Sequence, residues 1–310
     1  MVELMGDKTH SVPKKYEKPW LSYEQQLDRL VERGVSVKDK AAAAVFLSHV
    51  NYYRFSGYCL AFEADRHAFI KGVTFDDIVG AYKFDVGLRD LLTEALEIIE
   101  IDFRTCLAYH FGKQYGPFGH VNRSNFHDDF EHDEWLGHVR EEVKRSKELF
   151  VEHFHESYIE YPDLPIWMLS ETISFGTLSR MYRWMHKRDK REIAWRYGLQ
   201  NANLSSILLH LGYVRNLCAH HCRIWDRVWS VKPEPPHGRM WERPTMPDNR
   251  HLFVTICLIR HLLKRCPSVD EFAREWRERV FARFSGLPSA PYALRKMGMY
   301  DEWQKHPAFA

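Results

Sequence analysis

The apolar residues of this chain recur at intervals of three and four along most of its length, which is the period of a helix buried along one face. The strongest pattern follows Thr74 and Asp77, a pair with the spacing of a helix-capping box. Its periodic positions are Phe75, Ile78, Val79, Tyr82, Val86, Arg89, Leu92, Leu96, Ile99, Phe103 and Leu107, and the pattern continues as far as Gly112. At a rise of about 1.5 Å per residue this helix is longer than about 50 Å. We expect it to form the spine of the fold, and Gly87 offers a place for a kink.

Shorter helices precede this spine. Ser22 and Gln25 form another capping box, which opens a helix that ends at Gly34. An alanine-rich helix is expected over roughly 38–48, and a third begins near Asn51. The same period therefore accounts for nearly every apolar run before residue 74.

The segments after the spine also read as helices separated by breaks. The expected elements are a loop at 115–129, a charged helix at about 131–157, a break at 161–165, two helical pieces hinged at Gly176, a short helix near 189–197, and a helix capped by Asn203 that carries residues 213–225. The sequence thus predicts a further series of short helices after the long one.

The rest of the chain completes an all-α multi-helix bundle with no convincing strand pair. Residues 231–249 contain five prolines and are expected to form an irregular excursion. A helix follows at about 250–265, and Ser268 with Glu271 is expected to cap another that reaches Ser285. We therefore expect one helical domain at 21–285, between extensions at 1–20 and 286–310.

Charge and composition narrow the functional classes. The formal net charge is only +2, from 44 basic and 42 acidic residues, which excludes a strongly basic nucleic-acid coat. The first twenty residues contain no apolar secretory signal, and no run approaches the about 18 apolar residues of a membrane span. The six cysteines include no CxxC pair and are expected to be reduced thiols. These features predict a cytoplasmic protein without a membrane partner.

The densest chemistry lies in YVRNLCAHHCRIW, residues 213–225. On a helix Asn216 and His220 are one turn apart on one face, and Arg215 lies about 140° around the axis from His220. The long arginine side chain can still reach the same anion. Imidazole can transfer a proton, guanidinium can bind phosphate and offset developing charge, and Asn can orient an oxygen. With RNA, the 2′-hydroxyl supplies the nucleophile, so this chemistry requires no metal.

The hexapeptide RNLCAH matches the R-x4–6-H signature of HEPN ribonucleases, including a polar residue after the arginine. Four segments in this order resemble the Abi-like family of bacterial abortive-infection proteins, of the AbiD/AbiF type, over roughly residues 20–265. They are FLSHVNYYRFSGY (46–58), FDDIVGAYKFDVGLRDLLTEALEIIEIDFRT (75–105), LPIWMLSETISFGTLSRMY (164–182) and VRNLCAHHCRIW (214–225).

The resemblance implies metal-independent RNA cleavage that leaves a 2′,3′-cyclic phosphate and acts against phage, with no cofactor and no DNA partner. It assigns Arg215 to the phosphate and the transition state, Asn216 to orientation, and His220 to acid–base chemistry. Two such motifs usually meet across a dimer or pseudo-dimer, which implies a homodimer. AbiF-type relatives are thought to act with a small non-coding RNA, so RNA is both the expected substrate and an expected partner.

A second, weaker match lies on the long helix. Arg104 and His110 also fit R-x5-H, although Thr105 follows the arginine where the fuller pattern has a polar Asn, Asp or His. This pair is a candidate second half-site facing the first within one chain. The alternative is a core-facing Arg104 paired with Glu100 one turn earlier.

Other residues have competing interpretations. Glu171 lies in an apolar stretch and would need a partner if buried, for which Arg215 is a candidate. Tyr52, Tyr53 and Arg54, together with Arg223, are candidate RNA-binding residues, although such a density of aromatics is more typical of a core. The acidic residues Glu94, Glu97, Glu100 and Asp102 are expected to form a solvated or ion-paired face.

A zinc site is a further alternative. Cys218, His221 and Cys222 would share one helix face at spacings of three and four. Structural zinc normally requires four ligands, usually from two chain segments, and no second Cys/His pair has suitable spacing. Small buried cysteines are also common in helix packing. We therefore expect no metal.

Three functions remain open from the sequence. The first is a metal-independent endoribonuclease, and the second is a non-catalytic module that holds a structured small RNA. The third is a protein-binding helical scaffold, which would fail to bind RNA at low salt.

Overall fold

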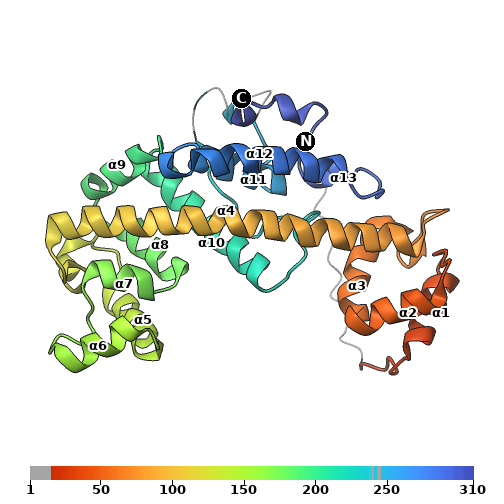
Figure 1. Cartoon of the computed structure of the whole chain (residues 1–310), viewed down its shortest axis with the longest axis horizontal. Helices are drawn as coiled ribbons and strands as arrows, with labels where there is room; N and C mark the ends of the chain where they lie inside the picture. Colours follow the sequence, from red (N-terminus) through yellow and green to blue (C-terminus); the bar gives the residue numbers. More distant parts are fainter. Residues whose placement is uncertain (1–14, 237, 239–240, 243–245) are drawn as a thin grey trace, which may run out of the picture.

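The computed structural model describes residues 15–310 except 237, 239–240 and 243–245. Its long central helix α4, Phe75–Tyr115, runs through the molecule without interruption, and the other helices gather along it (Figure 1). Both hydrogen bonds of the Thr74–Asp77 capping box are present. The expected spine and the all-α fold class are therefore confirmed.

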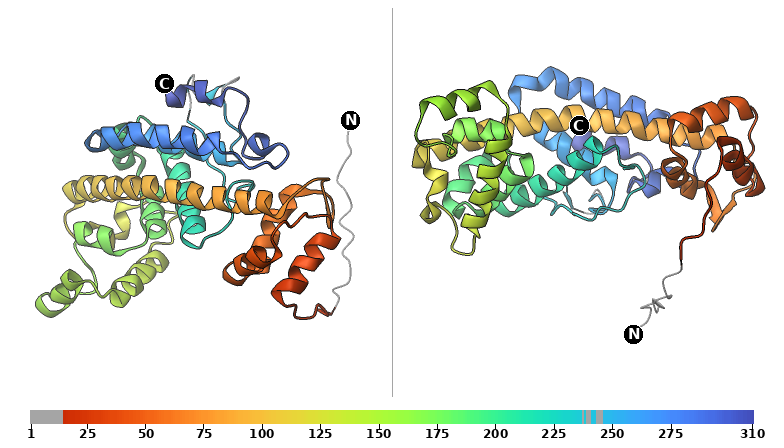
Figure 2. Two further views of the ribbon diagram at one scale, coloured as in Figure 1. Left: turned by 45° about the vertical axis from the view of Figure 1, so that its right-hand side comes forward. Right: turned by 90° about the horizontal axis from the view of Figure 1, so that it is seen from below.

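The helices before α4 lie at one end of it and those directly after it lie at the other, as the two views in Figure 2 also show. Helices α10 and α11 pack along its middle and α12 lies beside it. The remaining α-helices are α1 (Tyr23–Glu32), α2 (Lys40–His49), α3 (Tyr52–Cys59), α5 (His132–Arg145), α6 (Leu149–Ser157), α7 (Ile166–Thr172), α8 (Phe175–Trp184), α9 (Lys187–Arg196), α10 (Asn201–Ala219), α11 (Leu252–Leu263), α12 (Asp270–Ser285) and α13 (Ala293–Lys296). A two-stranded antiparallel hairpin, β1 (Glu63–Asp65) and β2 (Ala68–Phe69), precedes α4.

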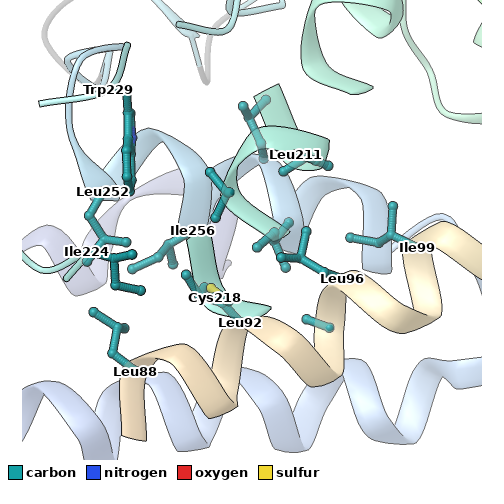
Figure 3. Packing of buried hydrophobic residues seen from close by; sticks show 14 of the residues in the cluster. Leu88, Leu92, Leu96, Ile99, Leu211, Cys218, Ile224, Trp229, Leu252 and Ile256 are labelled. Carbon is teal, nitrogen blue, oxygen red and sulfur yellow. The ribbon is translucent and has the colours of Figure 1, made fainter. Parts of the chain in front are cut away.

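Helix α4 is apolar on more than one face because helices cover it from several sides. Figure 3 shows Leu88, Leu92 and Leu96 of α4 packed with α10 and α11. On another side, the indole N–H of Trp276 in α12 donates to the carbonyl of Leu91, 2.8 Å away. Gly87 does not form a kink. A Cβ at this position would collide with the Arg283 guanidinium of α12, so the glycine permits close packing.

Several local expectations are wrong in detail. The charged segment 131–157 forms two helices, α5 and α6, separated at 146–148. The break between α7 and α8 falls at Ser174, which caps α8 by accepting from the Thr177 N–H, and not at Gly176. Asn203 lies inside α10 and donates to the carbonyl of Pro235, 3.0 Å away, so it braces the proline-rich excursion instead of capping the helix.

The described C-terminal residues pack onto the helical bundle. The proline-rich excursion is irregular where it is described. Its residues 237, 239–240 and 243–245 lie outside the described residues, and so do residues 1–14 of the expected N-terminal extension. Helix α12 begins at Asp270 without a side-chain cap, so Ser268 does not have the expected role. Met297, Trp303 and Phe309 are buried in the core beside α11 and α12, and Phe253 of α11 contacts both aromatic rings.

Within the described part of the chain, no helix combines the length and the apolar character needed to cross a bilayer.

Three buried histidines make the fold sensitive to acid. Burial lowers the pKa of His120, His210 and His261 to about 4, from an ordinary value of 6.5. The unfolded chain therefore binds protons at these groups before the folded chain does. The free energy of unfolding is expected to decrease as the pH falls from about 6.5 towards about 4.

His120 gives the clearest test, because neither of its ring nitrogens has a hydrogen-bond partner among the described residues. After burial, its titration is influenced by Asp163, His132 and Arg140. We expect His120→Leu to stabilise the protein more at pH 5 than at pH 8, by on the order of 1 to 2 kcal/mol in urea unfolding. The exposed His138 provides the control substitution to Leu. An equal effect of His120→Leu at both pH values would contradict the prediction.

Candidate functional site

The candidate site lies at the C-terminal end of α10. The core-facing side chains of this helix, among them Leu211, Val214 and Cys218, are buried, which leaves Arg215 and Asn216 exposed. The helix ends at Ala219, with His220 as its C-cap. This ending has both hydrogen bonds of a Schellman motif.

The Schellman motif sets the position of His220. The N–H of Cys222 donates to the carbonyl of Leu217 at 2.8 Å, and the N–H of His221 donates to that of Cys218 at 2.9 Å. His221 has a φ of 54°, the left-handed conformation that lets the chain leave the helix. The expected helix is thus confirmed as far as Ala219, whereas residues 221–225 follow a turn. His220 retains the helical N–H contact to the carbonyl of Asn216, at 3.0 Å.

Arg215, Asn216 and His220 are all exposed on this last turn. A guanidinium nitrogen of Arg215 lies 3.4 Å from the side-chain oxygen of Asn216. Neither Arg215 nor His220 is sealed in the core, so each side chain is open to a ligand from solvent. This arrangement provides one cation, one amide and one imidazole within six residues at the end of the helix.

Glu100 of α4 holds the arginine from the other side. Its Oε2 atom lies 3.7 Å from Nε of Arg215, while Oε1 accepts a hydrogen bond from Nε of Arg104 at 3.1 Å. The Glu100 side chain is only 12% exposed, whereas that of Arg215 is 48% exposed. Arg215 is thus anchored at one edge and keeps much of its guanidinium open to solvent. The expected ion pairing of the acidic residues on α4 is therefore confirmed at Glu100.

Arg104 is buried and connects α4 to α7. Besides Glu100, it donates to the carbonyls of Ser170 and Ile173, the latter at 2.8 Å. It therefore joins α4 to the end of α7, as expected of the core-facing alternative. His110 lies about 9 Å further along α4, where its Nδ1 contacts Oε2 of Glu192 in α9 at 3.0 Å. Among the described residues, no hydrogen bond or ion pair joins His110 to Arg215 or His220.

A buried charge network fixes the chain that follows His220. Asp85 of α4 is fully buried and accepts from the backbone N–H groups of Ile224 and Trp225, at 3.1 and 2.8 Å. It also accepts from the Tyr58 hydroxyl at 2.7 Å and from Arg89. Burial raises the pKa of Asp85, against the opposing effect of Arg89.

Arg89 extends this network to the turn itself, since it also donates to the carbonyl of Cys222 at 3.2 Å. The sequence analysis did not identify Asp85 or this role of Arg89. The available signal was a carboxylate and a guanidinium four residues apart among the apolar positions of the helix.

Helix α3 closes the other side of the turn. Arg54 donates to the carbonyl of His221, next to the candidate imidazole. Arg223 donates back to the carbonyl of Gly57 and forms an ion pair with Asp226 at 3.1 Å. Tyr53 is 88% exposed, whereas burial of Tyr52 raises its phenol pKa. Of these candidate RNA-binding residues, Tyr53 and Arg54 are the accessible ones at this end of α10.

The expected pairing of Glu171 with Arg215 is wrong. Glu171 is exposed on α7, and the carboxylate beside Arg215 belongs to Glu100. Glu171 instead lines an open depression between α4 and α7, together with Tyr109 and Trp167. Because its carboxylate remains in water, it needs no buried partner.

The zinc alternative requires Cys218, His221 and Cys222 to share one helix face, but the helix ends at Ala219. Cys218 is buried, which raises its thiol pKa to about 12, and His221 and Cys222 lie in the turn. The six cysteines are free thiols. Among the described residues, no group of three or more His, Cys, Asp or Glu side chains is arranged to hold a metal ion.

Comparison with known proteins identifies the family. A model of the family described as Abi-like protein matches residues 45–226, more than half of the chain. The match extends from α2 to the turn after α10 and includes Glu100, Arg215 and His220. No curated protein matches the chain, and no solved structure does either. The extent of the family match shows that the chain belongs to the Abi-like family, which is named for bacterial abortive infection.

Proposed function

We propose that this protein is a metal-independent endoribonuclease of the HEPN type that acts in abortive infection against phage. Family membership supports the role in abortive infection. The ribonuclease chemistry is supported by one observation, the exposure of Arg215, Asn216 and His220 on a helix end that Asp85, Arg89 and Arg54 hold in place. Such fixed backbone is what acid–base and phosphate groups require for preorganisation.

The proposed reaction uses the RNA itself as nucleophile. The neutral imidazole of His220 accepts the proton of a 2′-hydroxyl as the 2′-oxygen bonds to phosphorus. The 5′-oxygen leaves and takes a proton from an imidazolium, so the products are a 2′,3′-cyclic phosphate and a 5′-hydroxyl. Arg215 binds the phosphate and offsets the negative charge that develops in the transition state. Asn216 orients a ribose or phosphate oxygen.

The reaction removes a proton from the 2′-hydroxyl and donates one to the 5′-oxygen, on opposite sides of phosphorus. Two imidazoles are suited to these two transfers. In one chain Nδ1 of His110 contacts Glu192, at 3.0 Å, and among the described residues no hydrogen bond or ion pair joins His110 to His220. We therefore propose that a second copy of the chain supplies the second motif and that the working enzyme is a homodimer. Glu100 has a positioning role, because it contacts Nε of Arg215 while the arginine side chain remains 48% exposed and open to the phosphate.

The test is incubation of the purified protein with end-labelled RNA in the presence of EDTA. We expect the same cleavage rate with and without EDTA, because the nucleophile is the 2′-hydroxyl and not a metal-bound water. The fragments are expected to carry 2′,3′-cyclic phosphate ends. RNA in which the 2′-hydroxyls are replaced by 2′-methoxy groups is the control and is expected to stay intact. Loss of cleavage in EDTA, or fragments with 5′-phosphate ends, would contradict the mechanism.

A non-catalytic RNA-binding module is the second candidate. It is favoured by the contact between Arg215 and Glu100, which leaves the guanidinium partly neutralised in the absence of RNA. In this case the same three residues hold a structured small RNA without cutting it. RNA retained on the protein at low salt, with its ends unchanged, would support this candidate over the nuclease.

A further inference from the structure

An open depression of about 520 Å³ lies between α4 and α7, beside the candidate site. One wall is a stripe of α4 at helical spacing, and the other is α7. The residues that line it are Thr105, Ala108, Tyr109, Gly112, Lys113, Trp167, Ser170 and Glu171. Its size lies within the range of pockets that hold small planar molecules.

Two aromatic rings are exposed at this depression. Tyr109 is 65% exposed and Trp167 is 54% exposed, although both are large enough to be buried in a core. A Cβ atom at Gly112 would lie 3.1 Å from a methyl group of Ile166 and in ordinary contact, at 3.7 Å, with the indole of Trp167, so the start of α7 packs closely against α4 here. Exposed aromatic rings on rigid helices are the usual platforms for unpaired bases.

The polar residues of the depression supply one charge of each sign. Lys113 and Glu171 are both exposed, and neither has a hydrogen bond or ion pair within the described part of the chain. An ammonium group at this position can contact a phosphate. A free carboxylate can only accept hydrogen bonds, so it selects a base edge that donates.

Arg104 connects the depression to the candidate site through buried contacts. This arginine contacts Glu100, which holds Arg215, and it also donates to the carbonyl of Ser170, which lines the depression. Along α4 the depression begins at Thr105, about 8 Å from Glu100 by the rise per residue. An unpaired RNA strand whose linkage lies at Arg215 would thus reach the depression within a few nucleotides.

We propose that this depression is a subsite for one unpaired base of the RNA, with guanine preferred; the proposal rests on the proposed action on RNA. Tyr109 and Trp167 stack on the base, and Lys113 contacts a neighbouring phosphate. Glu171 accepts hydrogen bonds from N1–H and the exocyclic amine of guanine. Uracil offers a single N–H between two carbonyls, and adenine and cytosine present an amine beside a ring-nitrogen lone pair, so each of them pairs less well with a carboxylate.

The experiment measures equilibrium binding of labelled octanucleotides to the full-length protein carrying His220→Ala, which keeps the RNA intact. One octanucleotide contains uracil only, and a second series carries a single guanine at successive positions. We expect guanine to strengthen binding at one or two positions. Trp167→Ala and Tyr109→Ala are each expected to weaken binding about tenfold or more. Glu171→Gln is expected to remove the preference for guanine while binding of the uracil octanucleotide changes little.

Trp20→Ala is the matched control, because Trp20 is 85% exposed and stands just before α1, which lies at the opposite end of α4 (Figure 1). Circular dichroism checks that each variant is folded, and light scattering measures its oligomeric state. The subsite proposal is overturned if Trp167→Ala and Tyr109→Ala bind RNA as tightly as Trp20→Ala. It is also overturned if they lose RNA only because a dimer dissociates, since the depression would then hold a second copy of the chain. Cleavage by the protein with His220 intact tests the proposed function separately.

Discussion

His220→Ala and Arg215→Ala are each expected to reduce RNA cleavage by about 10² to 10⁴-fold. His220 is the exposed imidazole at the end of α10, and its loss removes the proposed acid–base group. Loss of Arg215 removes the cation that offsets charge on the phosphate. Initial cleavage rates on one labelled RNA, measured with excess enzyme, give the effect directly. Under the proposed function, expression of the unaltered protein is expected to arrest bacterial growth, and expression of either variant is not.

Two exposed residues outside the site provide matched controls. His138 of α5 and Arg274 of α12 are both exposed, so their alanine variants change the same residue types without touching α10. These controls are expected to cleave RNA at the original rate. Unfolding midpoints should be similar for all four variants, because the substituted side chains are in solvent. Cleavage at the original rate by folded His220→Ala would rule out the proposed role of the imidazole.

Asp85→Ala is expected to destabilise the fold by about 3 to 5 kcal/mol, the largest effect on stability that we foresee. The substitution leaves the Arg89 guanidinium, whose side chain is only 7% exposed, without its carboxylate. It also leaves the backbone N–H groups of Ile224 and Trp225 without their acceptor. Urea unfolding followed by circular dichroism measures the loss, and the variant is expected to cleave RNA poorly where it remains folded.

The matched control for this prediction is another carboxylate on the same helix. Glu94 binds Arg279 of α12 at 2.9 Å, but both side chains are nearly half exposed. Glu94→Ala is therefore expected to cost less than about 1 kcal/mol, as is usual for surface ion pairs. If Asp85→Ala cost no more than Glu94→Ala, the buried network would not be what fixes the turn after α10.

Where the signals that define a helix are local, the sequence predicted it well. Ser22 with Gln25 and Thr74 with Asp77 form the capping boxes that open α1 and α4, because each contact spans only three residues. The same reasoning failed where two local signals compete. Gly176 predicts a hinge after α7, yet Ser174 caps α8 and Gly176 lies within that helix.

In the candidate site too, contacts between neighbours in sequence were predictable and contacts between distant residues were not. Arg215, Asn216 and His220 lie within six residues, so their common position on one helix end followed from the order of residues alone. Glu171 was assigned to Arg215 because it is a carboxylate in an apolar stretch, but Glu100 occupies that position. Nothing in the local pattern distinguishes these two acids, since each lies on a different helix from Arg215.

The sequence by itself determined the helical period, the long spine and the cluster of polar groups at 215–220, because these depend on neighbours within a turn or two. Tertiary structure alone decided that Asp85 and Arg89 hold the turn after α10, that Glu100 contacts Arg215, and that His110 contacts Glu192. These contacts join residues that are far apart along the chain. They form only when α4 and the helices around it bury their apolar faces together.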